Sequence, residues 1–324
     1  MGEVAVTAAL PGDALARLGA RHRVRVRPPG PALAGRELVA FVGEADALVC
    51  LPADRVAAEA FALCPHLKVV ANYAVGVNNV DLEAARASGV WVTNTPDVLT
   101  GATADLTWAL ILAVARRVVE GDRLVRTGSF AGWRPDLLLG TGLQGKTLGI
   151  VGMGRIGRAV AARAAGFGMR VRYASLEPIP ASEAHGAAPV ATVDELLPLS
   201  DVLSLHCPLT TETRYLMNDR RLHLLPRGAL LVNTSRGEVV DEAALVAALE
   251  DGHLGGAGLD VYEREPEVHR ALVGRADVVL LPHVGSGTRE ARVAMADLVA
   301  DNVLAVLDGK TPPTPAVTPL VPRA

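Results

Sequence analysis

The chain has 324 residues, of which 50% are hydrophobic and 21% are charged, and its formal net charge is −3. This length exceeds what one hydrophobic core usually supports, so two domains are expected. The composition is that of a soluble globular protein, and the slightly negative charge gives no electrostatic reason to expect nucleic acid or an anionic membrane as a partner.

The cysteines and the N-terminus predict a cytoplasmic protein. Cys50, Cys64 and Cys207 form no C-x-x-C pair and no framework, so neither a disulfide nor a metal site is predicted. The N-terminus lacks a basic segment followed by an apolar one, so no signal peptide is expected. The apolar run Trp108–Ala115 is far shorter than the roughly 20 residues of a membrane span.

The first hundred residues alternate between strand-like and helix-like segments. A helix is expected over Asp81–Ala87, with Asp81 as its N-cap and Gly89 beyond its end. Alternating strands and helices predict a parallel sheet with helices on both faces. The expected strands are Val4–Val6, Val24–Val26, Ala47–Leu51, Val69–Asn72 and Trp91–Asn94.

The middle of the chain departs from this alternation. Residues Thr100–Val119 predict one long apolar helix, suited to a connection between domains. The segment Ser129–Leu143 contains Trp133 and Pro135 and follows no period, so it predicts an extended arm outside both cores.

A second alternating series then predicts a second α/β domain of the same general type. Helices are expected over Asp241–Glu250 and Thr288–Asp308, and the proline-rich tail Thr311–Pro319 has no core character. The expected strands are Leu148–Val151, Val171–Tyr173, Val202–Leu205, Leu230–Val232, Gly258–Asp260 and Val278–Leu281.

A glycine-rich turn joins the first strand of this series to the helix after it. The turn consists of Gly152, Met153, Gly154, Arg155, Ile156 and Gly157. The first glycine permits a tight turn, the second lets a pyrophosphate approach the backbone, and the third lets helix and strand pack closely. Amides at the start of the helix would face the phosphates. Such turns also occur for purely structural reasons, but a strand before it and a helix after it favour dinucleotide binding.

Three polar side chains that follow strands of the second series suit the reduction of a keto acid. Arg236 presents a fork of donors that fits a carboxylate, and His283 can give a proton to a carbonyl oxygen. Glu265 would stabilise and orient the protonated histidine. Taken singly, Glu265 is typical of a solvated loop residue and His283 of a satisfied loop histidine. Their combination at strand ends, downstream of a dinucleotide turn, favours the catalytic interpretation.

Seven segments, in order along nearly the whole chain, resemble one enzyme family. They are Asn72–Asp81, Val92–Pro96, Ala102–Asp105, Gly152–Gly157, His206–Leu209, Asn233–Gly237 and Leu259–Glu263. The chain resembles the D-isomer-specific 2-hydroxyacid dehydrogenases, and most closely their glyoxylate/hydroxypyruvate reductase branch. The resemblance implies two Rossmann-like or flavodoxin-like domains with parallel sheets and an active site in the cleft that separates them.

It also implies a division of labour between the domains. Residues 1–98 and 288–324 would bind a small 2-keto or 2-hydroxy acid, and residues 99–287 would bind the dinucleotide. The implied substrate-binding residues are Leu51, Val75, Gly76, Arg236 and His283, with backbone amides at Val75 and Gly76 holding the substrate carboxylate. The implied cofactor-binding residues beyond the glycine turn are Thr103, Ser175, Cys207, Pro208, Thr213, Thr234, Ser235, Asp260 and Gly285. Asp260 would hold the nicotinamide carboxamide, and the arm would cross the interface of a homodimer.

One position departs from the pattern of strictly NAD-dependent members. The strand at Val171–Tyr173 is expected to end near an Asp, whose carboxylate binds the ribose 2′-hydroxyl, but Ser175 stands there. The absence of this carboxylate removes the repulsion against the 2′-phosphate of NADP and favours NADP over NAD. However, NADP-dependent relatives usually follow with an arginine, and this chain has Leu176 and Glu177.

Other functions of the same family remain alternatives. Formate dehydrogenase is disfavoured, because its relatives carry Gln where Glu265 stands, and phosphite dehydrogenase is a distant option. The long type of phosphoglycerate dehydrogenase would need a C-terminal regulatory domain. Some relatives are NAD(H)-sensing transcriptional corepressors, which would need a surface for binding partner proteins. Oxidation of NADPH on addition of glyoxylate would distinguish an enzyme from such a binding protein.

Overall fold

The computed structural model describes residues 1–323, and the chain forms two compact units. One unit consists of Met1–Leu99 and Ser286–Ala324, and the other is the continuous segment Thr100–Gly285. The chain therefore leaves the first unit, completes the second, and returns to finish the first. Each unit is built on its own β-sheet, as predicted for an α/β protein.

The first unit is organised around a six-stranded sheet in the order β13-β5-β4-β3-β1-β2. Five strands run parallel, and β13 pairs antiparallel with β5. The central strands are short and entirely buried, as expected where helices cover both faces of a sheet. The strands are β1 (Glu3–Val6), β2 (Arg23–Val26), β3 (Ala47–Cys50), β4 (Val69–Asn72), β5 (Trp91–Thr93) and β13 (Pro315–Val317).

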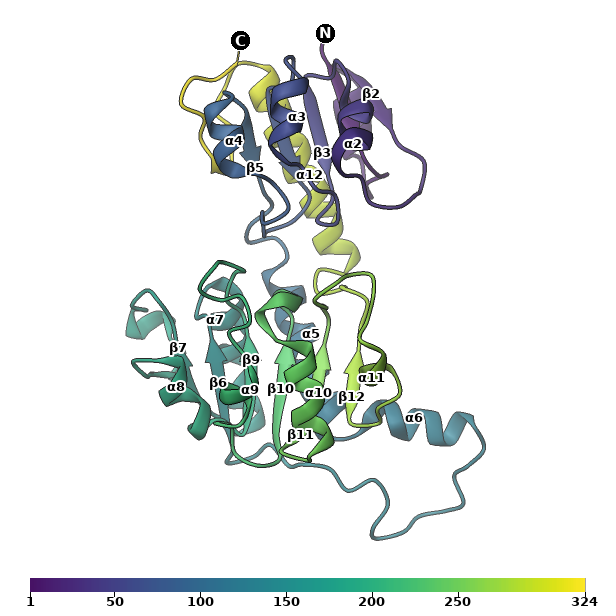
Figure 1. The fold of residues 1–324 in the computed structure, drawn as a ribbon, viewed down its shortest axis with the longest axis vertical. Helices are drawn as coiled ribbons and strands as arrows, with labels where there is room; N and C mark the ends of the chain where they lie inside the picture. Colours follow the sequence, from purple (N-terminus) through teal and green to yellow (C-terminus); the bar gives the residue numbers. More distant parts are fainter. Residues whose placement is uncertain (324) are drawn as a thin grey trace. The chain divides into compact units, whose positions relative to one another are not determined.

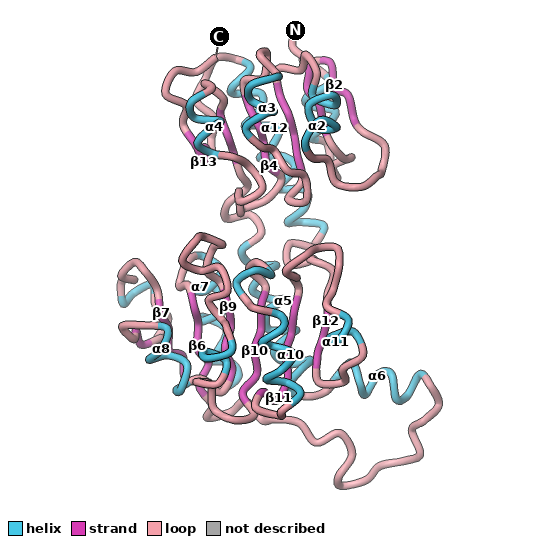
Figure 2. The backbone as a smooth tube through the Cα atoms, in the orientation of Figure 1, coloured by secondary structure: helices cyan, strands magenta, loops and turns pink. Residues whose placement is uncertain are grey.

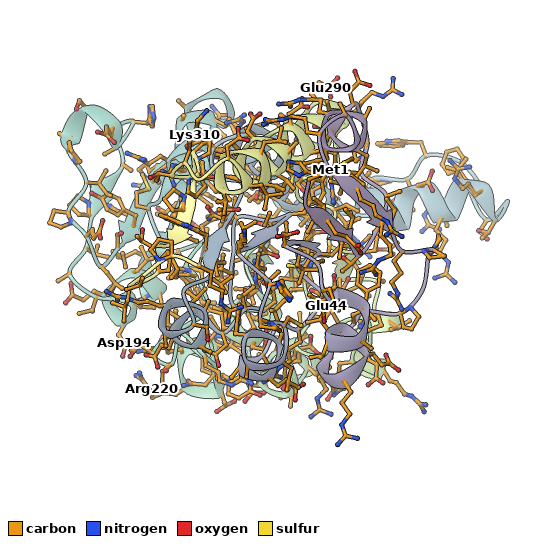
Figure 3. All side chains as sticks on the ribbon, turned by 90° about the horizontal axis from the view of Figure 1, so that it is seen from above. Met1, Glu44, Asp194, Arg220, Glu290 and Lys310 are labelled. Carbon is orange, nitrogen blue, oxygen red and sulfur yellow. The ribbon has the colours of Figure 1, made fainter. Side chains whose placement is uncertain are left out.

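Helices cover both faces of this sheet (Figure 1). Helices α2 (Gly35–Val42), α3 (Ala58–Leu63) and α4 (Leu82–Ala87) lie on one face, and α1 (Ala14–Gly19) and α12 (Arg289–Leu307) lie on the other. The predicted N-cap of α4 is confirmed, because Asp81 Oδ1 accepts a hydrogen bond from the Ala84 amide at 2.9 Å. In α12, Glu290 lies in the first turn and Lys310 just beyond the last, which complements the helix dipole (Figure 3).

The second unit contains a seven-stranded parallel sheet in the order β12-β11-β10-β9-β6-β7-β8. The strand order reverses beside β6, whose neighbours are β7 on one side and β9 on the other. Ligands of open α/β sheets bind at such a reversal, beyond the carboxyl ends of the strands. The strands are β6 (Thr147–Val151), β7 (Arg170–Ala174), β8 (Ala188–Pro189), β9 (Val202–Leu205), β10 (Ala229–Asn233), β11 (Leu254–Leu259) and β12 (Val278–Leu280).

Two hydrophobic clusters, one on each face, hold the helices of the second unit to its sheet. Side chains of α5 and α7 form one cluster, and side chains of α8, α9, α10 and α11 form the other (Figure 1). The helices are α5 (Thr100–Ala115), α7 (Arg155–Ala164), α8 (Val193–Leu196), α9 (Asp219–Leu222), α10 (Glu242–Glu250) and α11 (Arg270–Val273). No described helix is both long enough and apolar enough to cross a membrane.

The prediction of one long helix over Thr100–Val119 was wrong. Helix α5 ends at Ala115, and a separate helix α6 (Val118–Arg126) follows. Arg117, between them, has left-handed backbone angles (φ 53°, ψ 40°), which interrupt the helical hydrogen bonds. Its side chain instead pairs with Glu120 at 2.8 Å. After α6 the chain runs to β6 without helix or strand, in accord with the predicted arm (Figure 2).

The expectation that the tail after α12 has no core character was also wrong. Strand β13 adds to the edge of the first sheet, and Ala316 and Val317 pack against its core. Pro315 is tolerated because an edge strand leaves its outward backbone groups unpaired.

Arg323 fastens the end of this tail. Its guanidinium donates hydrogen bonds to the carbonyls of Phe61, Cys64, Leu67 and Ser88 at 2.6–3.0 Å. These carbonyls lie at or near the C-terminal ends of α3 and α4, where helices leave carbonyl groups unpaired. One side chain therefore ties the tail to two helices.

Arg323→Ala should destabilise the first unit. A hydrogen bond from a charged donor contributes about 1.5–3 kcal/mol, and water can replace some of the lost bonds, so a net loss of about 2 kcal/mol is expected. Denaturant unfolding measures it. Arg23→Ala is the matched control, because that arginine lies in the same unit, is largely exposed and pairs with Glu3 at 3.9 Å on the surface, so its loss should have little effect. Equal stabilities of the two variants would contradict the proposed role of Arg323.

Candidate active site

The glycine-rich turn after β6 is held by backbone contacts that exclude side chains. Gly152 has φ 92°, and a Cβ there would lie 2.6 Å from the Cys207 amide nitrogen. A Cβ on Gly157 would lie 2.3 Å from the carbonyl oxygen of Gly152. Both distances are far below van der Waals contact, so both positions require glycine, as the motif predicts.

Gly154 differs, because it faces open space. No described heavy atom other than those of its sequence neighbours lies within 4 Å of a Cβ built there. Gly154 is also the N-cap of α7, a helix of 10 residues whose first amides are not used by intrahelical bonds. The packing of the protein would therefore allow a side chain at position 154. A glycine at this position, at the positive end of a helix, fits the close approach of a pyrophosphate. Met153, Arg155, Ile156 and Gly157 complete this turn and the first turn of the helix.

Ser175 lies beside the glycine turn, as the predicted strand register requires. It directly follows β7, and the Gly152 amide donates to the Ala174 carbonyl at 2.9 Å. The turn and Ser175 therefore occupy the ends of the neighbouring strands β6 and β7, beside the switch point of the sheet. The next residue, Leu176, is 98% exposed, and Arg158 of α7 forms an ion pair with Glu183.

The loop after β9 carries Cys207, Pro208 and Thr213 on the other side of the turn. Thr213 Oγ1 donates to the Pro208 carbonyl at 2.6 Å, which closes this loop on itself. Burial raises the pKa of the Cys207 thiol to about 11, so it stays protonated and unreactive. Burial also lowers the pKa of His206 to about 3, and this neutral ring is hydrogen-bonded to Ser204 at 2.8 Å.

The loop after β10 is shaped by Asn233, a residue that the sequence interpretation did not single out. Its side chain donates to the Arg236 carbonyl at 2.8 Å and accepts from the Ser235 amide at 3.0 Å. Thr234 Oγ1 lies 3.0 Å from Thr107 Oγ1 on α5. Burial lowers the pKa of Arg236, and the negative charge of Glu265 opposes that effect. The carboxylate of Glu265 therefore acts electrostatically on the Arg236 guanidinium.

Asp260, at the end of β11, holds the loop that carries His283. Its two carboxylate oxygens accept from the Val284 and Gly285 amides at 2.8 and 2.7 Å, and its carbonyl accepts from the His283 amide at 2.8 Å. Burial raises the pKa of Asp260 despite these bonds. A Cβ on Gly285 would lie 3.2 Å from Asp260 Oδ2 and 3.4 Å from Thr103 Cγ2, so these three predicted cofactor residues lie together.

Glu265 and His283 form the predicted pair. Glu265 Oε2 lies 2.8 Å from His283 Nδ1, and Glu265 Oε1 accepts from the Tyr262 amide at 3.1 Å. Burial alone would raise the pKa of Glu265, but His283, the Tyr262 amide and the charge of Arg236 together hold it below its ordinary value. Nδ1 of His283 thus faces Glu265, and the side chain is 35% exposed.

Tyr262 and Gly237 position this pair and were not predicted. The Tyr262 hydroxyl donates to the Leu281 carbonyl at 2.8 Å, which joins the end of β11 to the segment that leads to His283. A Cβ on Gly237 would lie 1.9 Å from the Tyr262 carbonyl carbon, so the loop after Arg236 packs directly on the loop of Glu265. The segments Asn233–Gly237 and Leu259–Glu263 contain both residues, but no sequence signal indicates that they touch.

The other predicted substrate residues lie in the first unit, after adjacent strands. Leu51 directly follows β3, and Val75 and Gly76 lie in the loop after β4. All three are half-buried. In the described chain, the amides of Val75 and Gly76 donate no hydrogen bond. Free amides in a fixed loop are suitable donors to a carboxylate.

Comparison with known proteins points to one family. A model of the NAD binding domain of D-isomer specific 2-hydroxyacid dehydrogenases matches residues 108–285. Glyoxylate reductase of Thermococcus kodakarensis is 46% identical over 316 residues, covering 96% of this chain and 95% of that protein.

Solved structures agree over the same length. A protein from Thermus thermophilus has a crystal structure with a TM-score of 0.91 at 51% identity, covering 97% of this chain and 100% of that one. The NADPH-dependent glyoxylate/hydroxypyruvate reductase of Sinorhizobium meliloti, in complex with NADP and malonate, has a TM-score of 0.88 at 34% identity, covering 100% and 99%.

The lowered pKa of Glu265 gives a pH-dependent test. A carboxyl whose pKa is lower in the folded than in the unfolded protein adds stability above its unfolded pKa, and that stability is lost as the pH falls through the folded pKa. Glu265→Gln should therefore lower Tm most at neutral pH, and the difference from the native protein should shrink in the acidic range. Glu177→Gln, at an exposed position, should show no such trend. A Tm difference for Glu265→Gln that grew towards low pH would contradict the assignment.

Proposed function

The chain belongs to the D-isomer specific 2-hydroxyacid dehydrogenase family, and we propose that it reduces glyoxylate or hydroxypyruvate to the corresponding 2-hydroxy acid. A chiral product would have the D configuration. The observation that carries the proposal is the Glu265–His283 pair, which shares its electrostatic environment with Arg236 at the strand ends of the second unit. The cofactor is NADP or NAD, whose reduced nicotinamide would supply the hydride when bound.

We assign the proton transfer to His283. Its Nδ1 is occupied by Glu265 at 2.8 Å, so Nε2 is the atom that gives its proton to the carbonyl oxygen of the substrate. The negative charge of Glu265 stabilises the imidazolium before transfer and fixes the orientation of the ring. Tyr262, through its amide, keeps the carboxylate in place.

Two groups of donors are proposed to hold the substrate carboxylate. Arg236 provides a charged fork, and its partial burial strengthens any hydrogen bond to an anion. The amides of Val75 and Gly76 provide neutral donors, with Leu51 as an apolar neighbour. The glycine turn, Thr103, Thr234 and Asp260 are assigned to the cofactor, together with the other cofactor residues inferred from the sequence.

We further propose a cytoplasmic homodimer. Within the described residues no side chain of helix α6 is fully buried, and its Val118, Val119 and Val125 are exposed. In the segment after it, Phe130 and Trp133 are exposed too. Contact with a second copy would remove this apolar surface from water. The cytoplasmic location is supported by the cysteines, all of which are free thiols.

His283→Ala should lower kcat for glyoxylate by about 10²–10⁴-fold, the usual contribution of a positioned proton donor, with little change in NADPH affinity. NADPH absorbance follows the reaction, and fluorescence titration measures the affinity. His223→Ala is the control, because that exposed histidine also bonds to a carboxylate, Asp251 at 3.2 Å, but lies at the end of α9. If His283→Ala reduced glyoxylate at the rate of the unmutated protein, the proposed mechanism would be wrong. If the unmutated protein bound NADPH but did not oxidise it with glyoxylate, the chain would be a binding protein and not a reductase.

Ser175→Asp should shift cofactor preference towards NADH. The new carboxylate can accept from the ribose 2′-hydroxyl of NADH and repels the 2′-phosphate of NADPH. The measurement is the ratio of kcat/KM for the two cofactors. Val273→Asp adds the same charge at an exposed position on α11 and should leave the ratio unchanged. If the two variants behaved alike, Ser175 would not face the adenosine ribose.

A further inference from the structure

Three asparagines surround the loops of the first unit that carry Leu51, Val75 and Gly76. Asn72 ends β4, Asn94 follows β5, and Asn79 lies at the end of the loop after β4. None of them belongs to the substrate or cofactor residues proposed above. Asn72 is fully buried, which is costly for a side-chain amide unless its groups are hydrogen-bonded.

Asn72 and Asn79 bond to each other and join two loops. Asn72 Nδ2 lies 3.2 Å from Asn79 Oδ1, and Asn79 Nδ2 lies 3.1 Å from Asn72 Oδ1. Asn79 Nδ2 also donates to the carbonyls of Leu51 and Asp54 at 3.1 Å each. The loop after β3 is therefore fastened to the loop after β4 by one amide group.

Asp54 fixes the same loop from its other side. Its carboxylate accepts from the Leu51 amide at 2.9 Å, the Leu33 amide at 2.8 Å and the Thr7 hydroxyl at 2.6 Å. Leu51 is thus held at both its amide and its carbonyl, which leaves its backbone little freedom to move.

The remaining asparagine bonds act on the peptides next to the free amides. Asn94 Nδ2 donates to the Val75 carbonyl, and Asn72 Nδ2 donates to the Gly76 carbonyl, both at 2.8 Å. In a planar trans peptide the carbonyl and the following amide point in opposite directions. The bond to Val75 therefore aims the Gly76 amide, and the bond to Gly76 aims the Val77 amide. Within the described chain neither amide donates a hydrogen bond.

We infer that Asn72, Asn79 and Asn94 are positioning residues that aim the amides of Gly76 and Val77 at the substrate carboxylate and hold Leu51 beside it. The inference rests on the proposed function, since it requires that this loop bind the keto acid. Donors fixed before binding need no ordering when the anion arrives, so losing the asparagine bonds weakens substrate binding.

The test compares Asn94→Ala and Asn79→Ala with the native enzyme. Each is assayed for kcat and KM with glyoxylate, for inhibition by oxalate as a non-reducible carboxylate probe, and for NADPH affinity without keto acid. Both variants should raise KM and the oxalate inhibition constant about tenfold, the effect of roughly one hydrogen bond. Turnover at saturation and NADPH affinity should change little, because the carboxylate contact is the same before and during reaction.

Asp81→Ala is the matched control for a structural effect. It removes the N-cap of α4 two residues beyond Asn79, so it should lower Tm without changing KM or oxalate inhibition. The inference is overturned if Asn94→Ala keeps native KM and oxalate inhibition, or if it lowers only kcat, as a smaller folded fraction would. If Asn79→Ala does not fold, Asn94→Ala alone decides, since it frees a single loop carbonyl.

Failure of the proposed function would look different. The native enzyme would then not oxidise NADPH with glyoxylate, or Arg236→Ala would bind oxalate as tightly as the native enzyme. If the KM for glyoxylate rises in Arg236→Ala but stays native in Asn94→Ala, the proposed function holds and the proposed role of the asparagines is wrong.

Discussion

The chemistry of the second unit depends on backbone segments that touch where its strands end. Gly237 lies against the Tyr262 carbonyl, and Gly152 lies against Cys207, each so closely that a methyl group would collide. Because carbonyl and amide groups are far stiffer than side chains, the first contact fixes the spacing of the loops that carry Arg236 and Glu265, and the second fixes the glycine turn against the loop after β9. The spacing of these loops thus depends on glycines, whose lack of a side chain lets two backbone segments touch.

Buried polar side chains provide the second level of support. These side chains lie at the end of a strand or in the loop that follows it: Asn233 ends β10, Asp260 follows β11, and Asp54 lies in the loop after β3. Each forms hydrogen bonds with backbone amides or carbonyls of loops, which have no partner in the sheet. Such groups are costly to bury alone and become stabilising only as a complete set. Similar arrangements in both units place polar residues at the carboxyl ends of parallel strands, where ligands of this fold class bind.

Much of the fold and part of the site could be predicted from the sequence, for physical reasons. The strands are apolar runs bounded by turns. The glycine turn and Ser175 could be placed because each follows directly on such a run, and Glu265 and His283 because they lie in the loops after β11 and β12. The left-handed residue Arg117 and the edge strand β13 were missed, since neither has a local sequence signal and both depend on tertiary context. The asparagine bonds join residues up to 28 positions apart, which no local pattern encodes.

The order of the two units along the chain also governs how the protein is made. The second unit is one continuous segment, so all of it is synthesised before the ribosome reaches Ser286. Until then the first unit lacks α12 and β13, so one face of its sheet is covered only by α1 and the edge at β5 is open. An uncovered apolar face and an unpaired strand edge invite association with other chains. While the second unit is being synthesised, the segment Met1–Leu99 is therefore the part of the nascent chain that most needs a chaperone.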